Sequence, residues 1–417
     1  MRDFEHCIDV LKLVTKEGVP FSLAVNSSLK KSKNANNELR SVITSTCGGL
    51  FRHYYSLTKA VSLNYPDLEE DKSLLLALLL SNKLFSRRID EEKLFEFVKK
   101  ETGVDSLKDF LSKYNEPKLL IPEEVHFGSD EYHHLRSNLP LWLTRMWRKN
   151  LGPLLSKKLF KTFGNKDVQV LRIDRNNISY DDFFKKYSEY ATGDLEGLAY
   201  LNERVNKKQL LPVKEQNAID MHAGYAYMMR DIDVDIPRGI AVYGGCSNEI
   251  LDELYVRHGT SLKIDYLCGN QKHFFEVKKK IQRYGIMDIS IYECSHSALR
   301  TCISRPVHTF FLSPENSALQ RLSEESDYFL SVEKERLDEF IKIQNETLEE
   351  ASLLVEDGGQ IIYAVPTLCK NESFSLIKKF VETHPEYTIK EETQLLPFDK
   401  YHSMLYFAIL EKGVNHD

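Results

Sequence analysis

The second half of the chain alternates apolar segments of strand length with amphipathic segments of helix length. The apolar segments read GIAVYGG, SLKIDYLCG, DISIYEC, VHTFFLS, GGQIIYAVP and MLYFAIL. Helical patterns such as QKHFFEVKKKIQRYG lie between them and end on glycine. Strands that alternate with helices pair through helical crossovers, so this part predicts a parallel, doubly wound sheet. Such sheets bind ligands at the carboxyl ends of their strands.

The first part of the chain carries helical periodicity instead. Apolar residues recur every three or four positions in FEHCIDVLKLVTKEG and in NNELRSVITSTCGGLFRHYYSLTKAV, whereas KSLLLALLLSNKLF is apolar nearly all round. This pattern predicts an all-α bundle with the third segment as its buried central helix. Gly48 and Gly49, inside the second segment, predict close packing against a neighbouring helix.

The middle of the chain differs from both ends. LPLWLTRMWRKNLG interleaves two tryptophans with Arg145, Arg148 and Lys149. Two interpretations stay open, because such a segment can bind RNA through phosphate pairing and stacking, or form an amphipathic helix with core tryptophans. VQVLRIDRNNISYDDFFKKYSEY predicts a strand over 168–173, a turn and a helix, and therefore a small α/β subdomain.

Composition limits the classes of function. The formal net charge is −6, so a nucleic-acid surface must be a local basic patch and not a global field. Seven cysteines without a CxxC pair predict reduced thiols and a cytoplasmic protein. Cys294, His296 and Cys302 match no zinc spacing, so no metal is predicted. The longest apolar run, LLLALLL, is far too short for a membrane span.

Several motifs occur in an order that resembles one known family. CGGLFRHYYSL, LPLWLTRMW, VLRIDRNNIS, LLPVKEQNAIDM and LVEDGGQIIYAVPTLCKNES follow one another along nearly the whole chain. In this order they resemble the bacterial Sun-type branch of the Nop/Sun family, the RNA cytosine-C5 methyltransferases that use S-adenosylmethionine. The resemblance implies an α/β protein with an N-terminal all-α domain. Its parts would be a NusB-like RNA-binding bundle (1–125), a small α/β linking subdomain (126–212) and a Rossmann-like methyltransferase domain (213–417).

The resemblance does not extend to the catalytic cysteines. In the family a thiolate adds to C6 of the cytosine ring, and a second cysteine helps to release the adduct. The first cysteine belongs to a Thr-Cys pair that here reads Val365-Pro366, and the second falls at Glu315. An aspartate position falls at Leu312. Cys369 is the candidate substitute nucleophile, and the other interpretation makes it an ordinary loop cysteine.

The positions that would hold S-adenosylmethionine are altered as well. The resemblance places them at Tyr243, Gly244, Gly245, Cys268 and Glu293. An acid normally ends the second strand and holds the ribose hydroxyls, but that position falls on Cys268, with Asp265 three residues earlier. The third acidic position falls on Cys294, next to Glu293. Three contacts weakened by roughly 1–2 kcal/mol each would lower the affinity by several powers of ten.

Two functions follow from the resemblance. The favoured one is a family member that has lost catalysis, a pseudoenzyme that acts in rRNA binding or ribosome assembly. The alternative is an active, divergent S-adenosylmethionine-dependent rRNA (cytosine-C5) methyltransferase. In both cases RNA, and rRNA in particular, is the implied partner, with a ribosomal or assembly protein as a further candidate. The RNA contacts are expected at Arg52, Arg145, Arg148, Lys149 and Arg172.

Overall fold

The computed structural model describes residues 3–32, 36–163, 168–192, 195–201, 210–245, 247–400 and 402–414. The chain forms two compact units. The helical unit comprises Met1–Asn165 and Arg321–Glu333, and the sheet unit comprises Lys166–Gln320 and Lys334–Asp417. The division into three parts at residues 125 and 212 stays a prediction. The segment 126–165 groups with the helical unit, and the small subdomain that follows it groups with the large sheet.

The helical unit is built around the predicted central helix. Its α-helices up to residue 165 are α1 (Asp3–Thr15), α2 (Phe21–Lys30), α3 (Asn37–Arg52), α4 (Tyr54–Asn64), α5 (Glu70–Ser81), α6 (Glu91–Thr102), α7 (Leu107–Lys113), α8 (Asp130–Ser137) and α9 (Leu141–Thr162). The leucines from Leu76 to Leu80 of α5 are fully buried. A Cβ on Gly49 would lie 3.3 Å from Oγ of Ser81, which confirms close helix packing there. The predicted second helix is two helices, because it breaks at His53.

Helix α9 carries the tryptophan-rich segment and bends in its middle. Gly152 has a φ of +73°, outside the helical range, and Pro153 follows it. Trp147 is fully buried and stacks on Phe163 with ring centroids 5.5 Å apart. The core interpretation therefore holds for Trp147, while Arg145 and Lys149 of the same half-helix are exposed.

A segment from the second half of the sequence completes the helical unit. It contains α16 (Arg321–Glu324) and a 3-10 turn, η5 (Tyr328–Leu330). Phe329 is 4% exposed and packs on the rings of Tyr54 and Tyr55 at 5.3 and 5.1 Å. Asp327 accepts a hydrogen bond of 2.8 Å from the backbone N–H of Phe21. These contacts make the inserted segment part of the helical core.

The sheet unit contains a seven-stranded sheet in the order β10-β11-β9-β8-β5-β6-β7. The strands are β5 (Ile240–Gly244), β6 (Lys263–Cys268), β7 (Asp288–Glu293), β8 (Val307–Ser313), β9 (Val355–Val365), β10 (Tyr387–Leu395) and β11 (Leu405–Lys412). Strands β5 to β9 are parallel, whereas β11 runs antiparallel to both β9 and β10. The sheet is thus mixed and not wholly parallel. Strand β10 lies at the edge, and its polar sequence YTIKEETQL gave no apolar signal.

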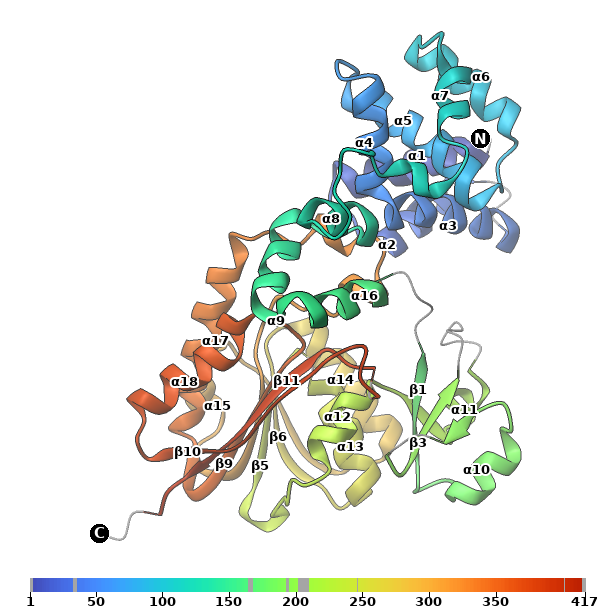
Figure 1. The fold of residues 1–417 in the computed structure, drawn as a ribbon. Coiled ribbons are helices and arrows are strands. Elements are labelled where there is room, and N and C mark those ends of the chain that lie inside the picture. The colour runs from blue at the N-terminus through green and yellow to red at the C-terminus, as the bar shows by residue number, and fades with distance from the viewer. Residues whose placement is uncertain are drawn as a thin grey trace. The chain divides into compact units, whose positions relative to one another are not determined.

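Helices cover both faces of this sheet (Figure 1). They are α12 (Ala223–Met229), α13 (Ser247–His258) and α14 (Gln271–Tyr284) on one face, and α15 (Leu299–Cys302), α17 (Arg336–Ser352) and α18 (Phe374–Thr383) on the other. Alternate residues along the central strands enter opposite cores: Val242 and Phe311 face the first set, while Ala241 and Phe310 face the second. The alternation of strands and helices in the sequence predicts this arrangement, with helices on both faces of the sheet.

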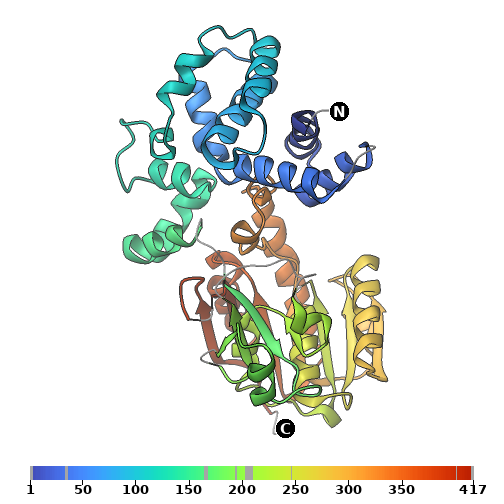
Figure 2. The ribbon, with the colours of Figure 1, turned by 90° about the vertical axis from the view of Figure 1, so that its right-hand side faces the viewer.

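A smaller antiparallel sheet lies beside α12 in the same unit, and Figure 2 shows it from another side. Its order is β2-β3-β1-β4, with β1 (Gln169–Ile173), β2 (Ala191–Thr192), β3 (Leu198–Leu201) and β4 (Ala218–Asp220). Helices α10 (Tyr180–Lys186) and α11 (Leu211–Lys214) accompany it. The predicted strand over 168–173 and the helix after it are confirmed. Strands β2 and β3 of this sheet were not expected.

The packing of the inserted segment predicts that Phe329→Ala destabilises the helical unit. Removal of this buried ring should lower its free energy of unfolding by roughly 3 kcal/mol or more. We expect faster amide hydrogen exchange in α4 of the full chain, measured by mass spectrometry. Leu154→Ala is the control, because Leu154 is 79% exposed in the same unit and its removal should matter little. Unchanged exchange in α4 of the Phe329→Ala variant would contradict a stabilising role for the segment.

Candidate functional site

The turn after β5 is shaped by a close approach of two strands. Gly244 pairs with Ser313 at the end of β8 and has a φ of +112°. A Cβ on Gly244 would lie only 1.6 Å from the carbonyl oxygen of Ser313. The fold itself therefore requires glycine at this position. Gly245 is exposed, and a Cβ there would meet no atom within 4 Å.

Two of the predicted cofactor positions are core residues. Tyr243 is 3% exposed and belongs to the core under α17 and α18, and Cys268 is fully buried in the core on the opposite face. The Tyr243 hydroxyl lies 3.4 Å from the place a Cβ on Gly269 would take, directly after β6. Burial, with the nearby Glu293, raises the pKa of the Cys268 thiol to about 12. The thiol is therefore neutral and apolar at physiological pH.

The acidic residues near this edge are placed unequally. Glu293 pairs with Cys268 in the sheet register and its side chain is exposed. Asp265 lies inside β6, opposite Ala241, where it accepts a hydrogen bond from the Tyr292 hydroxyl at 3.4 Å. Arg305 also lies 3.6 Å from the Asp265 carboxylate. The carboxylate of Asp265 thus contacts Tyr292 and Arg305 and lies away from the end of the strand, where an acid would hold the ribose.

The described residues do not fit S-adenosylmethionine as the family resemblance implies it is held. The second strand ends on a buried neutral thiol, where an acid would hold the ribose hydroxyls. Cys294, at the third acidic position, is also buried, and its thiol donates to the carbonyl of Ala298 at 3.2 Å. Only Glu293, among the five residues that the sequence singled out for the cofactor, offers an exposed charge.

The catalytic positions lie at the carboxyl ends of β8 and β9. Leu312 is fully buried within β8, and Pro366 is buried directly after β9. Glu315 has an exposed side chain, while its backbone carbonyl accepts a hydrogen bond of 3.0 Å from Gln344 of α17. None of the three residues carries the thiol that addition to a cytosine ring requires.

A buried carboxylate joins the loops that follow β8 and β9. Glu372 is fully buried, and its oxygens accept hydrogen bonds from the Ser317 N–H at 2.8 Å and the Ser317 hydroxyl at 2.5 Å. Thr367 donates at 2.9 Å and Gln344 at 3.0 Å. Four donors satisfy one buried charge, so the network ties the two loops together. No sequence pattern indicated this network, because its members lie up to 55 residues apart.

Cys369 lies next to this network and is not exposed as a nucleophile. Its side chain is 3% exposed. Burial and then the charge of Glu372 raise the pKa of the Cys369 thiol to about 11. A reactive cysteine needs the opposite environment, partly exposed and electropositive. The geometry supports the interpretation of Cys369 as an ordinary buried loop thiol.

Four of the five predicted RNA-contact residues belong to the helical unit. Arg52 is exposed at the end of α3, and Lys149 is exposed on α9. Arg145 and Arg148 both contact the carboxylate of Asp130, with Arg145 at 3.7 Å. The acid partly neutralises these two arginines, so the net charge of this face is smaller than the sequence suggests.

Arg172, the fifth residue, is buried inside the sheet unit, so its side chain is not accessible to RNA. It is 5% exposed, and its guanidinium forms two hydrogen bonds of 2.8 and 3.0 Å with the carboxylate of Glu253 on α13. Its remaining nitrogen donates to the carbonyl of Glu196 at 3.2 Å. Glu253 is itself fully buried and also accepts from Arg257 at 2.8 Å. The pairing joins the small sheet to the large one.

Metal sites and membrane spans are both absent from the described part of the chain. Within it, no three His, Cys, Asp or Glu side chains group as a metal site would require. His296, one of the three spaced candidates for a metal, instead contacts Glu346 at 3.0 Å. None of the helices in the described ranges is long and apolar enough to span a membrane.

Solved structures of similar fold include the following three. PH0851 is 16% identical, with a TM-score of 0.74 over 98% of both chains. A methyltransferase homolog protein from Pyrococcus horikoshii is 12% identical, with a TM-score of 0.56 over 69% of this chain and 100% of that one. NSun6 from Pyrococcus horikoshii, solved with SFG, is 10% identical, with a TM-score of 0.56 over 66% and 98%. No protein-family model matches the sequence, and no curated protein matches it.

These likenesses define the class of the fold. The chain is an α/β protein with an N-terminal helical part and a Rossmann-like, methyltransferase-type sheet. The architecture expected from the Nop/Sun resemblance is therefore confirmed at the level of the fold, which NSun6 from Pyrococcus horikoshii shares. At 10–16% identity the likeness concerns the fold and not the reaction.

The buried ion pair predicts a large decrease in stability for Glu253→Ala. The change leaves the Arg172 guanidinium buried without its carboxylate, which should cost roughly 3–5 kcal/mol of unfolding free energy in urea titrations. Glu382→Ala is the control, because Glu382 forms an exposed pair with Lys378 whose removal should cost under about 1 kcal/mol. Equal decreases in both variants would contradict this account.

The same pair predicts a pH dependence. Burial raises the pKa of Glu253, but Arg172 and Arg257 outweigh it, so the pKa lies below its usual value of 4.5. A depressed carboxyl pKa stabilises the folded state above pH 4.5, and this contribution is lost as the pH falls through the folded pKa. The difference in unfolding free energy between wild type and Glu253→Ala should therefore become smaller as the pH falls below 4.5. Urea titrations at a series of pH values measure this difference.

Proposed function

We propose that this protein is an RNA-binding member of the Nop/Sun family that has lost cysteine-dependent methyl transfer. It would act in rRNA binding or ribosome assembly. One observation carries the proposal: the loops after β8 and β9 hold Glu315 and Pro366 where the family places its two cysteines, and the thiol nearest in sequence, Cys369, is buried and neutral.

The chemistry of cytosine supports this proposal. C5 accepts a methyl group only after a nucleophile has added to C6, and the thiolate is suited to that reversible addition. Proline has no nucleophile, and a glutamate does not form the reversible adduct. The carboxylate of Glu372 instead accepts hydrogen bonds from donors in both loops. Among the described residues of these two loops, the interactions therefore support the loops, and none supplies a reactive thiol for the addition step.

An active enzyme is the second candidate. It would be a divergent S-adenosylmethionine-dependent rRNA methyltransferase whose reaction needs only the cofactor and a base. The observation that favours it is the exposed side chain of Glu315 at the carboxyl end of β8, whose charge lies near Tyr243. The exposed Glu293, at the end of β7, could also face a cofactor. Binding of S-adenosylmethionine separates the two candidates.

Calorimetric titration with S-adenosylmethionine should give no saturable heat up to millimolar concentration. The reason is the missing acid at Cys268 and the buried ring of Tyr243 at the first turn. Circular dichroism of the same sample shows that the protein is folded. A dissociation constant in the micromolar range would overturn the proposed absence of catalysis. Methylation of bulk rRNA by wild type and by Glu315→Gln would then be compared.

RNA binding should depend on the first half of α9. In Arg145→Ala/Arg148→Ala/Lys149→Ala, binding of purified rRNA should weaken, because three cations no longer neutralise phosphates. The slope of log affinity against log salt should flatten by about two, at roughly 0.7 for each phosphate released from the protein. The control removes three charges elsewhere: Lys342→Ala, Lys378→Ala and Lys379→Ala on α17 and α18. Unchanged affinity and slope in the α9 variant would reject these three residues as the RNA-binding set.

A further inference from the structure

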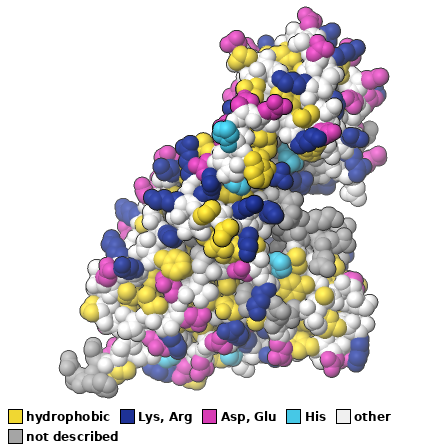
Figure 3. Space-filling view, viewed as in Figure 1, with side chains coloured by type: hydrophobic (Ala, Val, Ile, Leu, Met, Phe, Trp, Pro, Cys, Tyr) yellow, Lys and Arg dark blue, Asp and Glu magenta, His cyan; other side chains and the backbone are white. Residues whose placement is uncertain are grey.

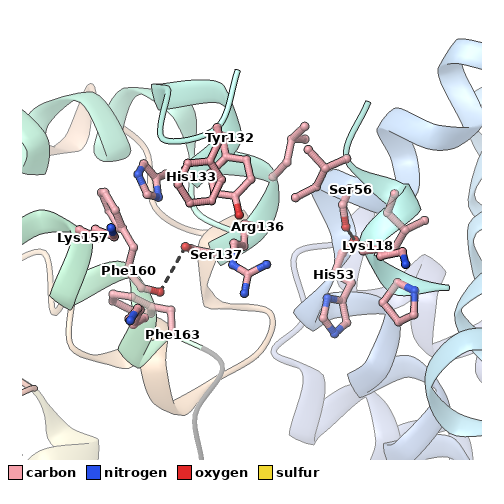
Figure 4. Close-up of a pocket in the computed structure, with 16 residues that line it drawn as sticks. His53, Ser56, Lys118, Tyr132, His133, Arg136, Ser137, Lys157, Phe160 and Phe163 are labelled. Carbon is pink, nitrogen blue, oxygen red and sulfur yellow. Dashed lines mark hydrogen bonds between the residues drawn. The ribbon is translucent and has the colours of Figure 1, made fainter. Parts of the chain in front are cut away.

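A cavity of about 720 Å³ opens in the helical unit. It lies within the roughly 300–1,000 Å³ range of small-ligand sites and is walled by α4, η2 (Pro117–Leu120), α8 and the second half of α9 (Figure 4). Sixteen residues line it, and none of them is Asp or Glu. Four are cationic: Lys118, Arg136, Lys157 and Lys161. Such a one-signed wall is unexpected in a chain with a net charge of −6.

The positive charge of the cavity is largely uncompensated. All four cationic side chains are exposed. Among the ion pairs between described residues, only Lys118 has an acidic partner, Glu116 at 2.7 Å. The nearby Asp130 is already occupied by the two arginines of the first half of α9. A cavity of this kind attracts an anion with several charges.

Aromatic rings form the remainder of the wall. The Phe127 and Tyr132 rings have centroids 4.8 Å apart, and those of His133 and Phe160 are 4.6 Å apart. Tyr132 and His133 are in contact at 5.5 Å, so the rings follow one another around the cavity. Phe127 is 77% exposed, so its ring is accessible to a ligand. In Figure 3 hydrophobic and His side chains lie among Lys and Arg over α8 and α9.

The two histidines of the cavity add polar atoms without adding charge. Burial and the neighbouring Arg52 lower the pKa of His53 to about 4. Burial, followed by Arg148, lowers the pKa of His133. Both rings are therefore neutral at pH 7 and can donate or accept hydrogen bonds. His133 is half-buried on α8 and contributes to the wall.

We propose that this cavity binds single-stranded RNA, with phosphates on Arg136, Lys157 and Lys161 and a base against Phe127 and Tyr132. The proposal rests on the proposed RNA-binding function and assigns it a site. Cationic side chains and exposed rings in one concave wall match the two parts of a nucleotide. A duplex keeps its bases stacked inside, so only an unpaired strand can use the rings.

This site is separate from the RNA contacts predicted on α9. Those contacts, Arg145 to Lys149, precede the bend at Gly152, whereas Lys157 and Lys161 follow it. Arg145, Arg148 and Lys149 are absent from the lining of the cavity. The two sets can therefore be tested independently within one full-length protein.

The first measurement uses a fluorescein-labelled single-stranded RNA of roughly twelve nucleotides and mixed sequence, within the size range of single-strand sites. Fluorescence anisotropy gives its affinity for the full chain over a series of KCl concentrations. Arg136→Gln/Lys157→Gln/Lys161→Gln should bind roughly tenfold or more weakly at low salt, with a slope reduced by about two. Lys99→Gln/Lys100→Gln/Lys108→Gln is the matched control, since these three lysines are exposed elsewhere in the helical unit.

The second measurement tests the rings separately from the charges. Phe127→Ala should weaken binding of the same RNA by roughly fivefold to a hundredfold, because one base no longer stacks, and should leave the salt slope unchanged. Leu154→Ala removes an equally exposed apolar side chain of α9 outside the cavity and should have no effect. A duplex of the same sequence should bind more weakly and be insensitive to Phe127→Ala.

The outcomes separate this inference from the function on which it rests. If wild type binds the RNA and the cavity variant matches its control, the cavity is not the site, although RNA binding stands. If wild type binds no RNA, the proposed function and this inference fail together. Equal affinity for inorganic polyphosphate, or for the duplex, would show a general anion surface and overturn the assignment to single-stranded RNA.

Discussion

Burial of the central strands on both faces is the constraint on which the sheet unit depends. Every residue of β5 is buried, and its neighbour β8 is buried at all but one position. Such strands need helices on both sides, and the crossovers then place every loop that follows a parallel strand at one edge. The approach of Gly244 to Ser313 fixes the centre of that edge. The positions expected to carry catalysis come together there for this reason.

The same edge has been filled by interactions that stabilise the fold. Tyr243 and Cys268 serve opposite hydrophobic cores, and Glu372 directs its charge to four donors from the surrounding loops. A polar group at that depth needs hydrogen-bond partners, because an unsatisfied one is costly. A site for methyl transfer would instead keep its thiol and its carboxylates open to ligands. The packing thus supports the proposal that this chain has lost cysteine-dependent methyl transfer.

The proposed RNA contacts, in contrast, are side chains that the packing leaves exposed. The bend at Gly152 divides α9 into two basic halves, one beside Asp130 and the other on the aromatic cavity. Exposed lysines and arginines retain their full charge, which a polyanion can use. Arg172 shows the opposite case, since the Glu253 carboxylate has fixed its guanidinium inside the protein. The residue type alone does not distinguish a basic side chain that can bind a polyanion from one that stabilises the fold. The burial of the side chain does distinguish them.

The sequence by itself determined the elements and the class of the fold. The alternation of apolar and amphipathic segments located the strands β5 to β9 and β11, because side-chain period reports local structure directly. It missed β10, an edge strand with one solvated face, and β3, whose pairing with β1 is not local. Only the tertiary structure decided which polar residues are buried. Arg172 and Glu253 are 81 residues apart, and the walls of the cavity in the helical unit come from four separate elements, so no local pattern could reveal either.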